Sequence, residues 1–239
     1  MKNITTFLAI VFFTTSIFAH TDANKEEEHV QQDARAFLQG IFDENSRHIK
    51  KHLTSELATI QDGQTPLATV VSCSDSRVQS DTIDSTPVNN LFYIRNIGNQ
   101  IETTLGSVKY GVRYLHTPVL LIIGHVDCGA VGAALGDYKH KPKALRKELH
   151  TFDFPEGITK KNGVILNVHN QVDTALKHFK EEVQDKSLVV IGAVYDFKNE
   201  YKQGYSRLIV VNLNGEKDPK VISESSYFKG MNHVKIGVE

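Results

Sequence analysis

The sequence has no excess of charge of either sign. Its 239 residues include 27 basic and 28 acidic side chains, which gives a formal net charge of −1. A near-neutral chain creates no overall field that would attract a polyanion, so we expect no nucleic-acid partner. Internal repeats, low-complexity tracts and a clear linker are also missing. With 40% hydrophobic residues, the chain is long enough to bury one sizeable core, which predicts a single domain.

A hydrophobic run long enough to span a bilayer is missing as well. Residues Met1 to Ala19 contain one charge, Lys2, followed by an apolar or hydroxylated stretch from Ile4 to Phe18. This stretch is shorter than the roughly 20 residues that a membrane span needs. We interpret residues 1–19 as a secretory signal peptide, with a retained anchor or a buried helix as alternatives. Removal after Ala19 predicts a secreted, periplasmic protein without a membrane attachment.

Cysteine is scarce, because only Cys73 and Cys128 are present, and His125 stands three residues before the second. Two thiolates and one imidazole suit a soft, tetrahedral ion such as zinc and leave one coordination position free. This is the ligand count of a catalytic zinc site. A disulfide is the alternative in an oxidising compartment, but the polar neighbours Asp75 and Arg77 favour a metal site.

The segment from about residue 24 to 53 is strongly charged, but apolar residues recur in it at helical spacing. They are Val30, Ala34, Phe37, Leu38, Ile41 and Phe42. This pattern predicts an amphipathic N-terminal helical arm, broken near residues 40–43, that precedes the rest of a single domain over residues 20–239. The apolar stripe must be buried either on its own sheet or on another subunit.

Short apolar runs rich in β-branched residues predict five strands. They are residues 67–72, 91–94, 119–124, 188–194 and 208–213. Helical patterns at residues 103–115, 128–135 and 162–179 lie between them. The alternation predicts an α/β fold with a mostly parallel central β-sheet flanked by helices. Residues 139–161, with two prolines and seven lysines or arginines, are expected to form a solvated excursion.

The predicted ligands follow two of these strands directly. Cys73 comes after the strand at residues 67–72, and His125 comes after the strand at residues 119–124. Ligands of open parallel sheets bind outside the carboxyl ends of the strands, so both parts of the site are expected at one edge. Cys128 is expected in the first turn of the next helix, where the helix dipole favours a thiolate.

Asp75 and Arg77 lie in the loop just beyond Cys73. An arginine held against the carboxylate keeps it ionised and fixes its orientation. Asp75 can then accept a hydrogen bond from zinc-bound water, or bind the zinc itself in a closed state. We therefore predict that both residues are catalytic. For either one alone, the alternative is a Ser/Asp turn with a surface arginine.

These motifs resemble those of the β-class carbonic anhydrases. Cys-Ser-Asp-Ser-Arg at residues 73–77 and Gly-His-x-x-Cys-Gly at residues 124–129 carry the resemblance, which extends over about residues 63–213. Supporting matches lie at residues 63–66, 95–99, 106–110 and 192–196. The resemblance implies a zinc lyase that reversibly hydrates carbon dioxide to bicarbonate and a proton.

The resemblance also implies roles for individual residues. Cys73, His125 and Cys128 match the family's zinc ligands, and Asp75 with Arg77 matches its catalytic dyad. Further matches to substrate-pocket positions are Gln64, as in the plant-like branch, Gly129, Phe92, Ile97 and Tyr110. Tyr110 would be lent by a neighbouring subunit, and a homodimer or a tetramer is implied. Simple core packing is the alternative for the three apolar pocket residues.

Two features depart from the family pattern. The family usually has a proline soon after the first motif, whereas the only proline in residues 78–90 is Pro87, near the end of that segment. In addition, Val70 stands where another branch of the family has tryptophan. That tryptophan helps to form an inhibitory bicarbonate pocket, which we do not expect in a chain without tryptophan. Two rival functions remain: a related zinc enzyme acting on another small cumulated molecule such as carbon disulfide, and a non-catalytic zinc-stabilised binding protein. Gln64 and Arg77 favour an enzyme.

Overall fold

The computed structural model describes residues 15–51 and 58–238. The chain divides into two compact units, Met1–Asp62 and Gly63–Glu239. The first unit contains helix α1 (Thr15–Lys51), and the second unit holds the sheet. None of the helices in the described ranges is long and apolar enough to cross a membrane.

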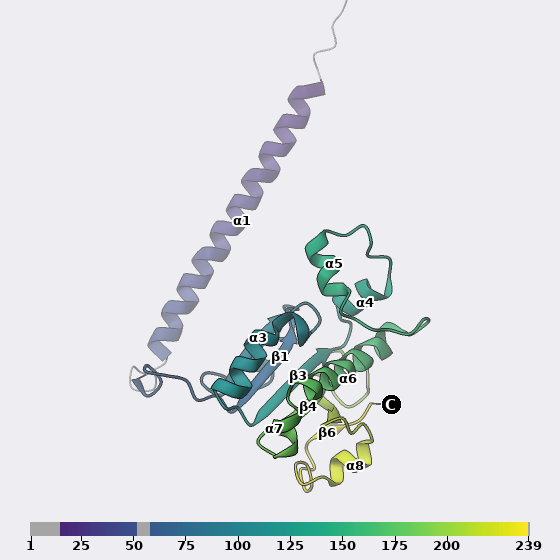
Figure 1. Ribbon diagram of the computed structural model, residues 1–239. Helices are drawn as coiled ribbons and strands as arrows, with labels where there is room; N and C mark the ends of the chain where they lie inside the picture. Colours follow the sequence, from purple (N-terminus) through teal and green to yellow (C-terminus); the bar gives the residue numbers. More distant parts are fainter. Residues whose placement is uncertain (1–14, 52–57, 239) are drawn as a thin grey trace, which may run out of the picture. The chain divides into compact units, whose positions relative to one another are not determined.

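Helix α1 is continuous, so the break predicted near residues 40–43 is wrong (Figure 1). A single glycine such as Gly40 costs a helix only about 1 kcal/mol, which its neighbours can offset. The stripe residues Phe37, Ile41 and Phe42 are exposed on this helix. The predicted cleavage point after Ala19 falls inside α1, whereas residues 1–14 of the predicted signal peptide lie outside the described residues.

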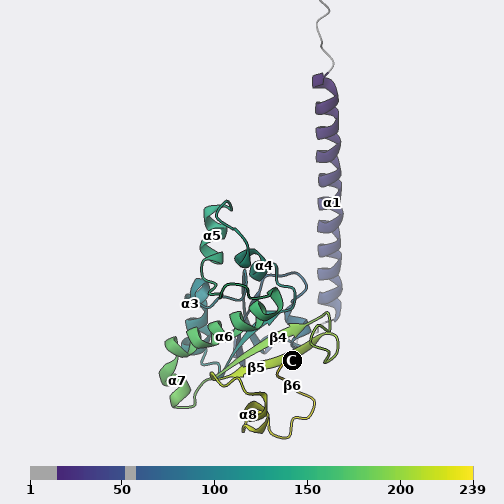
Figure 2. The ribbon, with the colours of Figure 1, turned by 90° about the vertical axis from the view of Figure 1, so that its right-hand side faces the viewer.

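The second unit is built on a six-stranded sheet in the order β2-β1-β3-β4-β5-β6. The strands are β1 (Ala68–Cys73), β2 (Leu91–Asn96), β3 (Val119–His125), β4 (Val189–Asp196), β5 (Arg207–Leu213) and β6 (Lys235–Ile236). Every neighbouring pair is parallel except β4 and β5. The predicted mostly parallel α/β sheet is confirmed, and Figure 2 shows its β4–β5–β6 side.

The helices of this unit are short except for one. They are α3 (Leu105–Lys109), α4 (Gly129–Leu135), α5 (Lys143–Leu149), α6 (Lys160–His178), α7 (Lys180–Gln184) and α8 (Pro219–Glu224). The single helix predicted at residues 103–115 is instead a 3₁₀ turn, α3 and a π turn at Tyr110–Tyr114. The predicted excursion at residues 139–161 contains α5, which is fixed to the unit by the buried Leu149.

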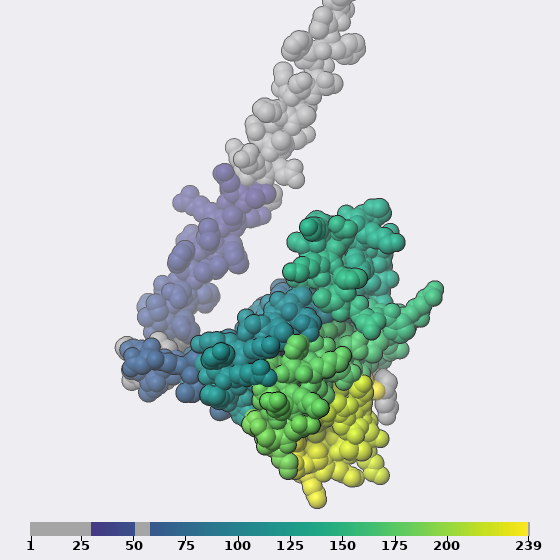
Figure 3. Space-filling model, in the orientation of Figure 1, coloured from purple at the N-terminus to yellow at the C-terminus, as the bar shows by residue number. Residues whose placement is uncertain are grey.

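The long helix α6 packs on β3, β4 and β5 and covers one face of the sheet (Figures 1 and 2). Its Val164 and Val168 belong to a buried cluster with Val194 of β4 and Ile209 of β5. Gly124 in β3 permits this close packing, because a Cβ there would lie 2.6 Å from a methyl carbon of Val168. Near the C-terminus β6 pairs with β5, and in Figure 3 the yellow atoms of this part of the chain lie against green atoms. His125, at the carboxyl end of β3, is fully buried.

Candidate metal centre

Cys73, His125 and Cys128 converge at one edge of the sheet. Cys73 is the last residue of β1 and His125 the last of β3, two adjacent parallel strands. Cys128 is the N-cap of α4, one position before the helical turn in which it was predicted. The two sulfurs and a ring nitrogen all lie within 4.8 Å of one another, and all three residues are buried. This spacing suits three ligands of one metal ion.

The hydrogen bonding of His125 directs one nitrogen toward the two sulfurs. Its Nδ1 lies 2.9 Å from the carbonyl oxygen of Val126, so the proton belongs on Nδ1 and donates to that oxygen. Nε2 is buried and has no hydrogen-bond partner among the described residues. A buried ring nitrogen without a partner is costly, and a metal ion is the partner that its lone pair fits. The residues present therefore fit zinc.

The two cysteines are free and adjacent. A hydrogen bond from the Cys128 thiol lowers the pKa of Cys73 to about 4, against the opposing effect of burial. The same hydrogen bond, together with burial, raises the pKa of Cys128. Backbone hydrogen bonds from Val131 and Ala130, at the start of α4, favour the thiolate of Cys128.

Asp75 and Arg77 form a bidentate pair beside the ligands. Arg77 donates from Nε to Oδ1 of Asp75 at 2.9 Å and from Nη2 to Oδ2 at 2.8 Å, and its backbone N–H donates to Oδ1 at 3.0 Å. These bonds, with the guanidinium contributing most, hold the pKa of Asp75 well below its usual range. Oδ2 of Asp75 lies 3.8 Å from Nε2 of His125. An ionised carboxylate therefore lies close to the buried ring nitrogen of His125.

Arg95 supports the backbone of this loop, a role that no pattern in the sequence indicated. It lies on β2 opposite Ser72 of β1. Its Nη2 donates to the carbonyl of Asp75 at 2.7 Å, and its Nε donates to the carbonyl of Cys73 at 3.3 Å. Its Nη1 donates to Gln79 Oε1 at 2.8 Å. One guanidinium thus joins a ligand residue to the dyad.

Gly98 is a second residue whose contact with the site the sequence did not reveal. Its N–H donates to the Cys73 sulfur, which helps to lower the pKa of that thiol. Its φ is +80°, and an added Cβ would lie 2.3 Å from the Phe152 ring, so only glycine fits. Its carbonyl accepts hydrogen bonds from the buried amides of Gln100 and Asn167. Motif residues 95–99 therefore contribute contacts to the metal centre.

The predicted pocket residues are less closely grouped. Phe92 of β2 pairs with Thr69 of β1. Thr69 lies four residues before Cys73, which places Phe92 about 13 Å along the strand from the level of Cys73. The Tyr110 ring lies 5.8 Å from that of Phe92. Within one chain, these two aromatic side chains therefore lie toward the far end of β2 from the metal ligands.

Ile97, Gly129 and Gln64 occupy other positions. Ile97 is 38% exposed and precedes Gly98 in the chain. Gly129 begins α4, and a Cβ added there would meet open space. Gln64 is exposed in the irregular segment before β1. Of the predicted site residues, the described structure groups the three ligands with Asp75 and Arg77.

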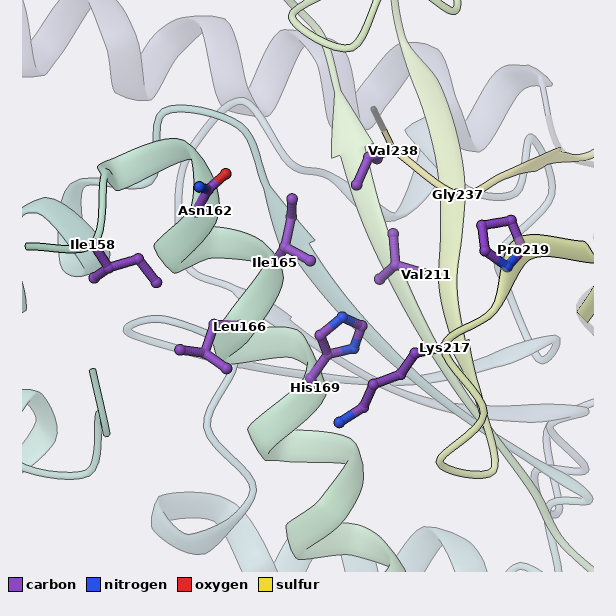
Figure 4. Close-up of a pocket in the computed structure, with 10 residues that line it drawn as sticks. All are labelled: Ile158, Asn162, Ile165, Leu166, His169, Val211, Lys217, Pro219, Gly237 and Val238. Atoms are coloured by element: carbon purple, nitrogen blue, oxygen red, sulfur yellow. The ribbon is translucent and has the colours of Figure 1, made fainter. Parts of the chain in front are cut away.

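A separate pocket of about 470 Å³ lies between α6, β5 and the C-terminal segment (Figure 4). Its lining residues are Ile158, Asn162, Ile165, Leu166, His169, Val211, Lys217, Pro219, Gly237 and Val238. Burial, with a smaller effect of Lys217, lowers the pKa of His169 to about 4. This imidazole is therefore neutral at pH 7. None of the residues predicted for the metal site lines this pocket.

Comparison with known proteins gives one consistent result. A family model described as carbonic anhydrase matches residues 68–201. Carbonic anhydrase 2 of Mycobacterium tuberculosis is 40% identical over 74 residues, which are 30% of this chain and 36% of that protein. The chain thus matches about a third of the length of this curated relative.

Two solved structures share the fold. The β-carbonic anhydrase CcaA has a TM-score of 0.58 at 22% identity, covering 69% of this chain and 83% of that one. A structure of tetrameric β-carbonic anhydrases from Sordaria macrospora has a TM-score of 0.51 at 22% identity, covering 72% and 92%. The aligned part includes most of the second unit's length.

Proposed function

The chain belongs to the carbonic anhydrase family, and on that basis we propose that it reversibly hydrates carbon dioxide to bicarbonate and a proton with the help of zinc. The observation that carries this proposal is the convergence of Cys73, His125 and Cys128, with the unpartnered Nε2 of His125 buried among the described residues. Zinc in such a site lowers the pKa of its water to about 7 and makes hydroxide available near neutral pH.

The chain's own residues set up the reaction around that metal. The carbonyl of Val126 holds His125 in the tautomer that presents Nε2. Arg77 keeps Asp75 ionised and fixes its carboxylate, so that Asp75 accepts a hydrogen bond from the attacking oxygen and orients it. Arg95 fixes the backbone of Asp75, so the carboxylate is held from both sides. The proton released in each turnover leaves toward solvent.

The finer assignments of the pocket are also part of the proposal. Gln64, in the place typical of the plant-like branch, and Gly129 are proposed to contact the substrate. Phe92, Ile97 and Tyr110 are proposed as apolar walls. Because Phe92 and Tyr110 lie along β2 away from the ligands of their own chain, a neighbouring subunit's copies are better placed to complete each site.

We further propose a homodimer or a tetramer of dimers. The exposed apolar residues Val30, Phe37 and Phe42 of α1 support an interface with a second copy. Tyr110 and Tyr114, which are 47% and 74% exposed, support a second contact at the β2 edge of the sheet. The fold relatives from Sordaria macrospora are described as tetrameric.

Export to the periplasm is proposed from residues 1–19. N-terminal sequencing of protein recovered from a periplasmic fraction tests this proposal, and a chain that begins at His20 is the expected result. Recovery of the uncleaved chain with the membrane fraction would instead indicate a retained anchor.

The decisive experiment is a stopped-flow assay of carbon dioxide hydration on purified protein with a parallel zinc determination. His125→Asn is the matched control, because it removes the metal-binding nitrogen from the site. We expect activity in the wild type and none above background in the variant. Carbon disulfide as a second substrate identifies the rival enzyme, and zinc without turnover of either substrate identifies a binding protein.

A further inference from the structure

Asp127 occupies an unusual backbone position between two of the metal ligands. It follows His125 by two residues, precedes Cys128 and has a φ of +56°. Left-handed backbone is unfavourable for residues other than glycine, and aspartate is among the side chains that tolerate it best. Such a conformation persists when surrounding contacts hold it. The side chain of Asp127 makes contacts that do so.

Three cations from different parts of the chain surround this carboxylate. Lys160, the first residue of α6, donates from Nζ to Oδ1 of Asp127. Lys198, which follows β4, has its Nζ 3.4 Å from Oδ2. Nη1 of Arg77 lies 4.0 Å from the same Oδ2. Asp127 thus joins the loop between the ligands to α6, to β4 and to the dyad arginine.

The contact with Arg77 is made on an edge of the guanidinium that Asp75 does not use. Asp75 takes the Nε and Nη2 edge, whereas Nη1 points toward Asp127. One face of the same guanidinium lies over the Phe197 ring, 4.5 Å from its centroid. The guanidinium is therefore held from three directions, although the Arg77 side chain is 46% exposed.

We propose that Asp127 is a positioning residue. It lies at the opposite edge of the Arg77 guanidinium and keeps that group oriented toward Asp75. An exposed ion pair alone orients a long side chain weakly. A second carboxylate, itself anchored by Lys160 and Lys198, restricts the rotation of Arg77 away from Asp75. Removal of that charge leaves two ammonium groups near the guanidinium without their common anion, and their repulsion displaces Arg77.

The first test follows Arg77 itself and needs no turnover. The side-chain Nε–H resonance of Arg77 is identified in ¹⁵N NMR spectra by its loss in Arg77→Ala. We expect hydrogen exchange of this group to become about tenfold faster in Asp127→Asn, both with and without zinc, and to recover in part in Asp127→Glu. Asp173→Asn is the matched control, because Asp173 is also a half-exposed carboxylate paired with a lysine, Lys217. Exchange that is unchanged in Asp127→Asn would overturn the proposal.

The second test measures coupling and rests on the proposed function. Residues that orient the groups of a metal site without binding the metal typically cost about tenfold or more in affinity or activity when changed. We expect Asp127→Asn to lower the activity of the otherwise wild-type protein about tenfold while the zinc content stays unchanged. In a protein that already carries Arg77→Ala, Asp127→Asn should lower the activity hardly any further. An equal loss in both backgrounds, or loss of zinc, would show that Asp127 acts on the ligand loop and would overturn the proposal. If the wild type does not hydrate carbon dioxide, the proposed function fails, and the NMR result still decides the position of Arg77.

Discussion

Asp75 Oδ2 lies 3.8 Å from the buried Nε2 of His125, and the Arg77 guanidinium holds the carboxylate in place. This relationship puts a fixed negative charge beside the open side of the three-ligand set. A carboxylate in that position can accept a hydrogen bond from whatever occupies the fourth coordination position. The predictions below start from this geometry.

Asp75→Asn and Arg77→Ala are each expected to lower kcat for carbon dioxide hydration by about 10²- to 10⁴-fold, because each removes the oriented acceptor. Zinc content should stay near that of the wild type. The double variant should be little worse than either single one, since the two side chains act as a unit. Stopped-flow kinetics, with Asp185→Asn as a surface control, checks this prediction. Near-normal turnover in either variant would mean that Asp75 and Arg77 only stabilise a turn and take no part in catalysis.

The purified chain is expected to carry about one zinc ion per subunit, because two sulfurs and one ring nitrogen lie close enough together to bind a single ion. Cys73→Ser should lower the zinc content strongly. Elemental analysis together with mass spectrometry of fresh protein provides the measurement. A Cys73–Cys128 disulfide without zinc is the result that contradicts this prediction.

Arg95→Met is expected to lower the free energy of unfolding by about 1.5–3 kcal/mol, because the carbonyls of Asp75 and Cys73 lose a charged donor. The activity should fall as well, since the dyad loop is no longer fixed. Arg95→Lys keeps the charge but not the planar fork, so it should restore only part of both quantities. Urea unfolding and hydration kinetics on the three proteins separate these effects, and equal stability of Arg95→Met and wild type would contradict the supporting role.

The pH dependence of stability should include a contribution from His169. Its folded-state pKa is lowered to about 4, mainly by burial. Between pH 4 and about 6.5 the unfolded chain therefore binds a proton that the folded chain does not. This contribution is complete above pH 6.5, and it is lost as the pH falls toward 4. The free energy of unfolding, measured with urea at pH 4.5 and at pH 7, should differ less between the two pH values for His169→Gln than for the wild type. An equal difference in both proteins would contradict the prediction.

Phe37→Ser combined with Phe42→Ser is expected to weaken self-association. Both side chains are exposed on α1 in the single chain, and burying each against a second copy would be worth roughly 1.5–3 kcal/mol. If sites are completed across subunits, dissociation should lower the activity as well. Sedimentation analysis at micromolar concentrations with parallel kinetics tests this, and a fully active wild-type monomer is the contradicting result.

Residue types and their local spacing were enough to predict the chemistry of the site and the class of fold. Continuous β-branched runs predicted the buried parallel strands, because strands covered on both faces need apolar residues at every position. The three metal ligands could be predicted from residue types and their places in the sequence. His125 and Cys128 are close in the chain, and Cys73 and His125 each stand at the end of an apolar run that predicts a strand. The spacing from Cys73 to Arg77 is equally local. Short-range patterns of this kind do not depend on how the rest of the chain is arranged.

Which distant residues meet depends on how the strands and helices pack in three dimensions. Arg95 faces the carbonyl of Asp75 because β1 and β2 pair with Ser72 opposite Arg95, and a strand pattern of period two does not specify its partner or its register. Asp127 meets Lys160, Lys198 and Arg77 because α6 begins and β4 ends beside the ligand loop. The same register places Phe92 of β2 four residues from the level of Cys73, and the ring of Tyr110 lies beside that of Phe92. These contacts join segments separated by tens of residues, and packing of the whole sheet is what brings such segments together.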